Sequence, residues 1–246
     1  MIKFFKKLRY DLMQKKKTTK YLKYAIGEIV LVVIGILIAL QINNWNQNRI
    51  EKNEEKYIIA NLHKDFSENK KQLEKYIIGL QNEMNANLEL MNLIGETKNE
   101  LLKQNLDSLF YNSFGSTELA FADNTLKNIM QSGQLNLLKN EEVTRLLYKW
   151  NELSEIRTTR IDKLEDWAND KFVPYLLSKI SFKEMDAEGN FIWTGKSKIK
   201  PDYFALFQEI EFENYLDNNL WHHQKLLERC AETEKLIDEI IIATKP

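Results

Sequence analysis

Three residues near the C-terminal end of the chain have side chains of the type that binds divalent metals: Asp217, His222 and His223. Adjacent residues of a helix point about 100° apart, so the two imidazoles cannot easily share one ion. The spacings Glu-x-x-His and His-Glu-x-x-His, which place metal ligands on one helix face, do not occur in the sequence. We therefore predict no metal site, a surface position for His222 and a hydrogen-bonded core position for His223.

The segment before Pro201 resembles a phosphate-binding loop, because Gly195-Lys196-Ser197 follows an earlier glycine, Gly189. A phosphate loop has four residues between its glycines and opens a helix, whereas five residues separate the glycines here. The alternating polar residues that begin at Asp186 resemble the start of a calcium loop, but the glycine comes fourth instead of sixth. We predict a solvated loop without a bound nucleotide or cation.

Cys230 is the single cysteine of the chain, so no intrachain disulfide can form. Nucleophilic catalysis has no support, because neither Gly-x-Ser-x-Gly nor a paired Cys/His arrangement occurs. With 36 Asp and Glu residues, a close carboxylate pair is expected by chance and is no evidence for acid–base chemistry. We predict no catalytic residue and no cofactor. Cys230 is expected to be a buried thiol, with a reactive or dimer-bridging thiol as the alternative.

The elements that must position these residues are helices. Only eight Gly and three Pro occur in 246 residues, which suits long helices and disfavours a turn-rich β fold. Apolar residues recur at helical spacing over residues 57–94, 143–176 and about 203–243. The last stretch has a stripe with gaps of four and three, typical of an antiparallel bundle or coiled coil: Leu216, Leu220, His223, Leu227, Cys230, Glu234, Ile237 and Ile241. We predict an all-α fold with an antiparallel helical bundle.

Capping residues predict where these helices begin and end. Gly95 is the first C-cap after the long amphipathic stretch. Asp123 and Gly133 bracket a short helix over residues 124–131, and Asn140, followed by two acids, begins the next helix. Pro174 is expected to kink or break that helix. Residues 182–202 are predicted to form a loop.

Residues 24–42 form a nearly unbroken apolar stretch with Glu28 as its one charge. Nineteen residues that each rise about 1.5 Å match the ~30 Å hydrocarbon core of a bilayer. The alternatives are a buried helix of a soluble protein and a cleavable signal peptide, but residues 40–42 provide no small-x-small cleavage site. We predict an uncleaved transmembrane helix.

Charge asymmetry predicts the direction of this helix. Residues 1–23 carry nine Lys and Arg and one acid, whereas residues 43–65 carry four of each sign. The basic end stays in the cytoplasm, so we predict a single-pass inner-membrane protein with its C-terminal domain in the periplasm. Tyr21, Tyr24 and Trp45 are expected to lie at the two interfaces as aromatic anchors.

Small residues on one face of the apolar stretch, Gly27, Gly35 and Ala39, are predicted to let two copies of the helix approach closely. The predicted organisation is a cytoplasmic basic segment (1–23), a transmembrane helix (24–42), a long helix leaving the membrane (43–95) and a helical domain that packs back on it (96–246).

Two segments carry a resemblance to a known family. The first joins the basic FFKKLR of residues 4–9 to KYLKYAIGEIVLVVIGILIALQINNWN of residues 20–46. The second is LKNIMQSGQLNLLKNEEV, residues 126–143. Together they resemble an uncharacterised family of single-span inner-membrane proteins of Bacteroidetes. The resemblance implies a membrane anchor with a helical periplasmic domain, and it implies no activity.

The leading functional prediction is a membrane-anchored helical interaction or scaffold protein, of which a sensor-like domain is one version. Its expected partners are the lipid bilayer and either a second copy or another envelope protein. Nucleic acid is not expected, because no basic stripe follows residue 42. The alternative is a periplasmic enzyme or a helical domain that binds a small ligand. A deep pocket with several polar groups would favour the alternative, and a filled bundle core would favour the first prediction.

Overall fold

The computed structural model of the chain describes residues 10, 18–115, 118–189, 191, 193 and 195–245, and the side chains of residues 18–21 are outside this description. Most of the predicted cytoplasmic segment and the side chain of Tyr21 therefore lie outside the described residues. The chain divides into two compact units, Met1–Tyr57 and Ile58–Pro246. We call the second unit the helical domain.

The longest element is helix α2, Thr18–Asn92, which contributes to both units. Its N-terminal part includes an 18-residue window with a mean hydropathy of 2.6, none of which is buried. Ile29, Leu31 and Leu37 are 63%, 63% and 58% exposed. So many adjacent apolar side chains are unfavourable in water but favourable in hydrocarbon. By length and composition, this helix fits a membrane anchor.

The prediction of an all-α fold is confirmed, since the described residues contain helices and no strand. After α2 the elements are α3 (Lys98–Leu101), α4 (Leu106–Ser113), α5 (Asn124–Gln131), the 3-10 helix η1 (Gln134–Leu137), α6 (Glu141–Trp167), the π-helical turn η2 (Ala168–Phe172), α7 (Val173–Leu176), α8 (Phe182–Ala187), α9 (Tyr203–Leu206) and α10 (Ile210–Ala243).

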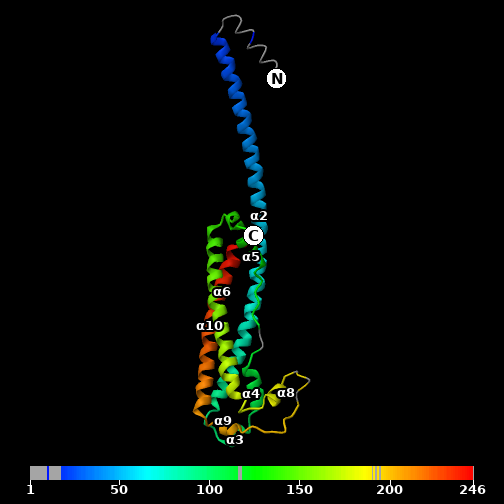
Figure 1. Cartoon of the computed structure of the whole chain (residues 1–246), viewed down its shortest axis with the longest axis vertical. Helices are drawn as coiled ribbons and strands as arrows, with labels where there is room; N and C mark the ends of the chain where they lie inside the picture. The colour runs from blue at the N-terminus through cyan, green and yellow to red at the C-terminus, as the bar shows by residue number, and fades with distance from the viewer. Residues whose placement is uncertain are drawn as a thin grey trace. The chain divides into compact units, whose positions relative to one another are not determined.

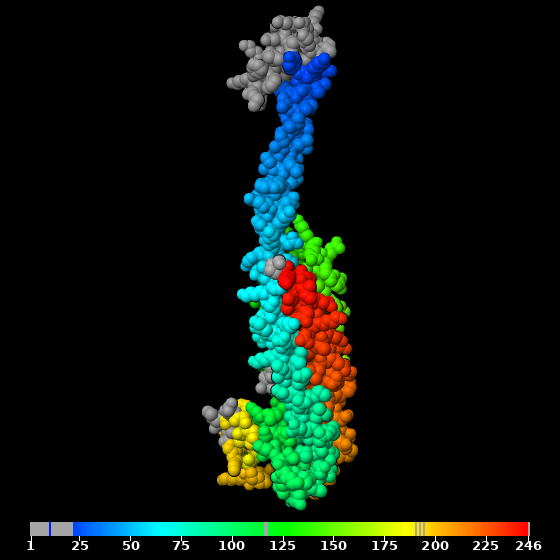
Figure 2. Space-filling model, turned by 180° about the vertical axis from the view of Figure 1, so that it is seen from behind, coloured from blue at the N-terminus to red at the C-terminus, as the bar shows by residue number. Residues whose placement is uncertain are grey.

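Three long helices build the helical domain: the part of α2 from Ile58, α6 and α10 (Figure 1). Helix α10 is antiparallel to α2, because His63 meets Thr244 at one end and Asn87 meets Asn219 at the other. Figure 2 shows the orange and red surface of α10 against the cyan part of α2. Helix α6 is also antiparallel to α10 and therefore runs parallel to α2.

Apolar side chains of the domain gather in two separate clusters. The upper cluster joins α2, α5, α6 and the C-terminal half of α10, and it includes Leu62, Phe66, Trp150, Cys230 and Ile237. The lower cluster joins the end of α2, the turn η2 and the short helices α3, α4, α7, α8 and α9 to the start of α10. It includes Leu90, Phe110, Phe172, Phe207 and Phe212. The residues between the two clusters are largely polar.

The predicted stripe of α10 is half right. Leu216, His223, Cys230 and Ile237 are buried, but the alternate predicted positions are only half-buried. The residues one position earlier are buried instead: Asn219, Leu226, Thr233 and Ile240. The shift follows from polar pairing, because Asn219 and Thr233 hydrogen-bond to residues on α2 and α6. Glu234, predicted on the stripe, is therefore not a core residue.

Buried Asn69 ties α2 to the irregular segment before α5. Its Nδ2 donates to the carbonyl oxygen of Ala122 at 3.0 Å, and its Oδ1 accepts from the Ala122 N–H at 2.6 Å. These two hydrogen bonds satisfy the backbone N–H and carbonyl of Ala122, which have no helical partner. Backbone groups of a loop that passes along a core need such partners.

Most predicted helix boundaries agree with the structure. Asn140 caps α6, because its Oδ1 accepts from the N–H groups of Glu142 and Val143. Helix α5 has the predicted bounds, but the Asp123 side chain forms an ion pair with Lys127 at 2.8 Å instead of a cap. Gly95 and Gly133 have φ of 77° and 73°, which favours glycine at both turns.

Two predictions about the chain after α6 need correction. Helix α6 ends at Trp167, before Pro174, and the π-helical turn η2 lies between them. The predicted loop over residues 182–202 begins with a helix, α8, because the Ser181 side chain accepts from the Glu184 N–H and caps it.

Cys230 should be almost unreactive in the folded chain. Its side chain is fully buried, and burial raises the pKa of the thiol to about 11. Compared with a thiol of ordinary pKa, Cys230 then forms the reactive thiolate about a hundredfold less often near neutral pH. We expect maleimide labelling to be slower than for an exposed cysteine by at least this factor, and urea to remove the difference. The reference is Ala231→Cys in a Cys230→Ser background; equal labelling rates would contradict the buried position.

Candidate functional site

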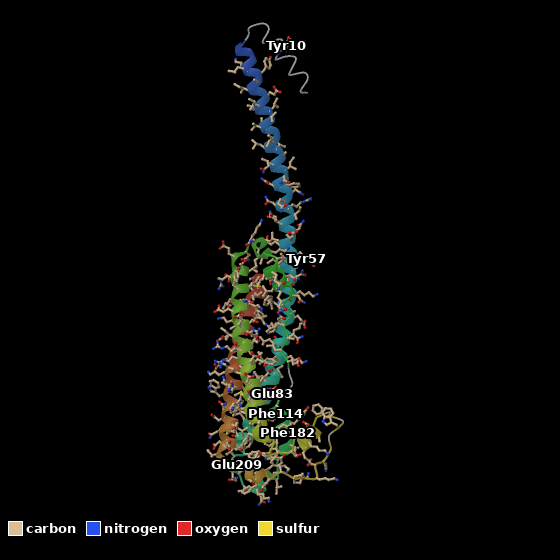
Figure 3. The ribbon with its side chains drawn as sticks, viewed as in Figure 1. Tyr10, Tyr57, Glu83, Phe114, Phe182 and Glu209 are labelled. Atoms are coloured by element: carbon tan, nitrogen blue, oxygen red, sulfur yellow. The ribbon has the colours of Figure 1, made fainter. Side chains whose placement is uncertain are left out.

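A pocket of about 350 Å³ opens between the two apolar clusters of the helical domain. Helix α2 lines it with Tyr76, Leu80 and Glu83, and α10 lines it with Asn219 and His223. The remaining wall comes from the end of α4 and the residues after it, and from α6 to α7: Ser113, Phe114, Gly115, Ile161, Leu164, Glu165, Ala168, Asn169 and Val173. Figure 3 shows Glu83 and Phe114 close together at this level.

The polar centre of the pocket is the contact between His223 and Glu83. The Nδ1 atom of His223 lies 2.9 Å from the carbonyl oxygen of Asn219, which can only accept, so Nδ1 carries a hydrogen. Its Nε2 lies 3.3 Å from Glu83 Oε2. A hydrogen bond between these two atoms requires a proton on one of them, either on Nε2 or on Oε2. His223 is 3% exposed, so the prediction of a hydrogen-bonded core histidine is correct.

Two buried asparagines hold this pair in place. Asn219 Nδ2 donates to Asn87 Oδ1 at 2.9 Å. Asn87 Nδ2 in turn donates to the carbonyl oxygens of Glu83 and Ser113, at 2.9 and 3.1 Å. These bonds join α2, α4 and α10 at one level. A buried polar network whose members are paired fixes the register of the helices it joins.

Glu83 and Tyr76 leave polar atoms unpaired in the pocket. Glu83 Oε1 makes no hydrogen bond with the described residues, and it packs so closely on Gly115 that a Cβ there would lie 1.6 Å away. Tyr76 is 7% exposed, and its hydroxyl likewise has no hydrogen-bond partner among the described residues. Burial raises the pKa of Tyr76, so its hydroxyl keeps its proton and can both donate and accept.

Arg157 lies one turn before Ile161 and is also buried, at 3% exposure. Its guanidinium lies 4.5 Å from the ring centre of Phe121 and 5.2 Å from that of Trp150. It donates to Ser154 Oγ at 2.8 Å, and no ion pair links it to a carboxylate among the described residues. Burial lowers the pKa of Arg157 to about 10, which still leaves it charged near neutral pH.

The π-helical turn η2 borders the pocket through Ala168 and Asn169. A π turn widens a helix locally and is often found at functional sites. At its start, the Nε1 of Trp167 is buried without a hydrogen-bond partner within the described part of the chain. The Trp167 ring stacks on His222 with centres 5.9 Å apart. His222 is therefore half-buried rather than on the surface, and burial, followed by the charge of Arg160, lowers its pKa.

The structure separates the residues that the sequence suggested for metal or phosphate binding. His222 and His223 face Trp167 and Glu83, respectively. Within the described residues, no group of three or more His, Cys, Asp or Glu is placed to hold a metal ion. The loop at Gly195 closes on Glu184 instead of on a phosphate, since the Ser197 N–H and Lys200 Nζ both donate to Glu184 Oε1.

A scan against protein families matches residues 28–134 to a family of unknown function, DUF6090. Searches of the curated proteins and of the solved structures found no match. The match supports the expectation of an uncharacterised domain. The matched residues include Tyr76, Glu83 and Asn87, whereas Asn219 and His223 lie beyond them. The family match therefore covers the pocket residues of α2 and those from Ser113 to Gly115, and it assigns no activity to the pocket.

Sequence reasoning missed most of the residues that form this pocket, including Tyr76, Glu83 and Asn219, and it also missed Asn87, the hydrogen-bond partner of Asn219. One signal was available: both asparagines occupy positions that continue the buried spacing of their helices, after Leu80 and before His223. A polar residue at such a position indicates a buried hydrogen-bond partner.

Proposed function

We propose that this chain is a membrane-anchored helical protein whose domain binds a small molecule in the pocket at Glu83 and His223. In this proposal residues 24–42 span the inner membrane, residues 1–23 stay in the cytoplasm and the helical domain faces the periplasm. Membership of a single-span family of Bacteroidetes is part of the same proposal. Tyr24 and Trp45, which are 51% and 64% exposed, would then lie at the two membrane interfaces.

The observation that carries the ligand-binding part is the pocket itself. A bundle that acts only as a scaffold would gain stability by filling this space with apolar side chains. Instead the space is open, has the size of a small-molecule site and contains polar atoms of Glu83 and Tyr76 that have no partner among the described residues. Water can satisfy such atoms, and so can a ligand, which would gain orientation from them.

The pocket is tested by filling it. The full chain, reconstituted in nanodiscs of zwitterionic lipid, is screened by thermal unfolding against a library of small polar metabolites. We expect at least one compound to raise the unfolding midpoint by several degrees. Ala168→Phe, which places a ring in the pocket, should abolish this rise, while Ala231→Phe on an exposed face of α10 should preserve it. If no compound in the library distinguishes these two variants, the proposal is contradicted.

The topology is tested separately with reporters fused to the C-terminus. A periplasmic phosphatase should be active in this position, and a fluorescent protein that matures only in the cytoplasm should stay dark. The opposite pattern would contradict the proposed orientation without affecting the pocket.

Self-association through Gly27, Gly35 and Ala39 stays a prediction, as does contact with another envelope protein. At Gly27 and Gly35 an added Cβ would meet no atom within 4 Å. This part of the helix is therefore open to a partner helix or to lipid.

A further inference from the structure

We infer that the pocket takes an organic cation: a primary ammonium group attached to a short apolar body. This inference rests on the proposed ligand-binding function and adds the chemical class of the ligand. It follows from the charges, the walls and the unpaired atoms of the pocket.

The charges favour a cation. The lining residues include two carboxylates, Glu83 and Glu165, and neither Lys nor Arg. His223 can neutralise one carboxylate at most, through its contact with Glu83. The charge of Glu165, an exposed residue, therefore remains among the lining residues, and an anionic ligand would meet it without a lining Lys or Arg to compensate. Arg157 does not line the pocket, and its guanidinium is held between Phe121 and Trp150.

The unpaired atoms show where an ammonium group would lie. Glu83 Oε1 is able to accept a hydrogen bond and has no partner among the described residues. The Tyr76 hydroxyl comes from a residue more than nine-tenths buried, two helical turns before Glu83 on the same face of α2, and it has no hydrogen-bond partner among the described residues. An ammonium group can donate to an oxygen of either kind. The rings of Tyr76 and Phe114 add aromatic surface, which attracts cations.

The opposite wall accommodates the rest of the ligand. It is formed by aliphatic side chains from α6 and the start of α7, namely Ile161, Leu164 and Val173, and Leu80 adds an aliphatic side chain on the α2 wall. A volume of about 350 Å³ lies at the small end of the range for ligand sites. These features favour a compact body, and they disfavour a fully polar polyamine.

A matched set of probes tests the inference on the full chain in nanodiscs of phosphatidylcholine. The probes are 2-phenylethylammonium, its neutral analogue 2-phenylethanol and the anion 3-phenylpropionate, measured by calorimetry. We expect the ammonium to bind at least tenfold more tightly than either analogue. Tighter or equal binding of the alcohol or the anion would overturn the inference, and so would absence of ammonium binding.

Matched variants locate the binding group. Glu83→Gln keeps the shape of the side chain and replaces the carboxylate that would accept from the ammonium group with a neutral amide, so ammonium binding should weaken at least tenfold. Glu89→Gln makes the same change on an exposed position of α2 and should leave binding unchanged. Tyr76→Phe should weaken binding of 2-phenylethylammonium without changing binding of 2-phenylethanol. If Glu83→Gln fails to fold, the comparison among the three probes on the unmodified chain still decides the inference.

The two proposals fail in different ways. If the alcohol or the anion binds best and Ala168→Phe abolishes it, the pocket is a ligand site but not for cations. If none of the probes and no library compound distinguishes Ala168→Phe from Ala231→Phe, both the pocket function and its cation preference are wrong.

Discussion

Replacing Val33 and Leu37 with arginine is expected to keep the chain out of the membrane. The stretch 24–42 contains twelve Ile, Leu and Val residues, and each favours insertion by about 0.3–0.6 kcal/mol, or about 4–7 kcal/mol together. Each arginine at mid-span costs about 3 kcal/mol and also removes one favourable residue. The two changes therefore cancel the driving force for insertion. The measurement is the fraction of chain that sediments with alkaline-washed membranes.

The control for this experiment places the same two charges, four residues apart, just beyond the span. Asn44→Arg with Asn48→Arg should leave the chain in the washed membranes. If the mid-span variant also stays in the washed membranes, residues 24–42 do not anchor the protein in the membrane.

Trp150→Ala is expected to destabilise the helical domain by about 3–5 kcal/mol, the usual cost of deleting a large buried aromatic side chain. Trp150 is 3% exposed, and its ring lies 4.9 Å from Phe66 and 5.1 Å from Phe121. It also covers the guanidinium of Arg157, which would lose one of its two aromatic neighbours. Urea unfolding of the full chain in mild detergent, followed by circular dichroism, measures the loss.

Tyr148→Ala is the matched control, because Tyr148 lies on the same helix with 56% exposure. Its loss should be under about 1 kcal/mol, as for most surface substitutions. Similar losses for the two variants would mean that α6 does not face α2 in the way described.

Local chemistry made the helix boundaries predictable. Asn140 caps α6 through bonds to residues two and three positions later, and Gly133 supplies a left-handed turn within three residues of α5. Such interactions are encoded by neighbours in the sequence, so one sequence is enough to find them. The all-α fold followed from the same kind of information, since helical spacing repeats along each helix.

The register of the helices could not be found in this way. Apolar spacing in α10 suggested Leu220 and Glu234, whereas Asn219 and Thr233 are buried one position earlier. Their partners, Asn87 and Arg157, lie more than seventy residues away in the sequence. A polar residue counts as a surface residue in any periodicity argument until its distant partner is known.

The candidate site was unpredictable for the same reason. Glu83 and His223 are 140 residues apart, and neither belongs to a local motif. The space between them exists because two apolar clusters form at different levels of the bundle and leave a polar layer between them. Only the packing of α2, α6 and α10 reveals that layer.

The contact between His63 and Thr244 brings the beginning and the end of the helical domain together, at 3.3 Å between Nδ1 and Oγ1. A short peptide could therefore join residue 245 to residue 58, and new termini could be opened in the exposed turn near Lys103. Domains whose two ends lie close together tolerate circular permutation of this kind well. The same proximity makes the domain suitable for insertion into a loop of a soluble carrier protein, which would allow its binding properties to be studied in aqueous buffer.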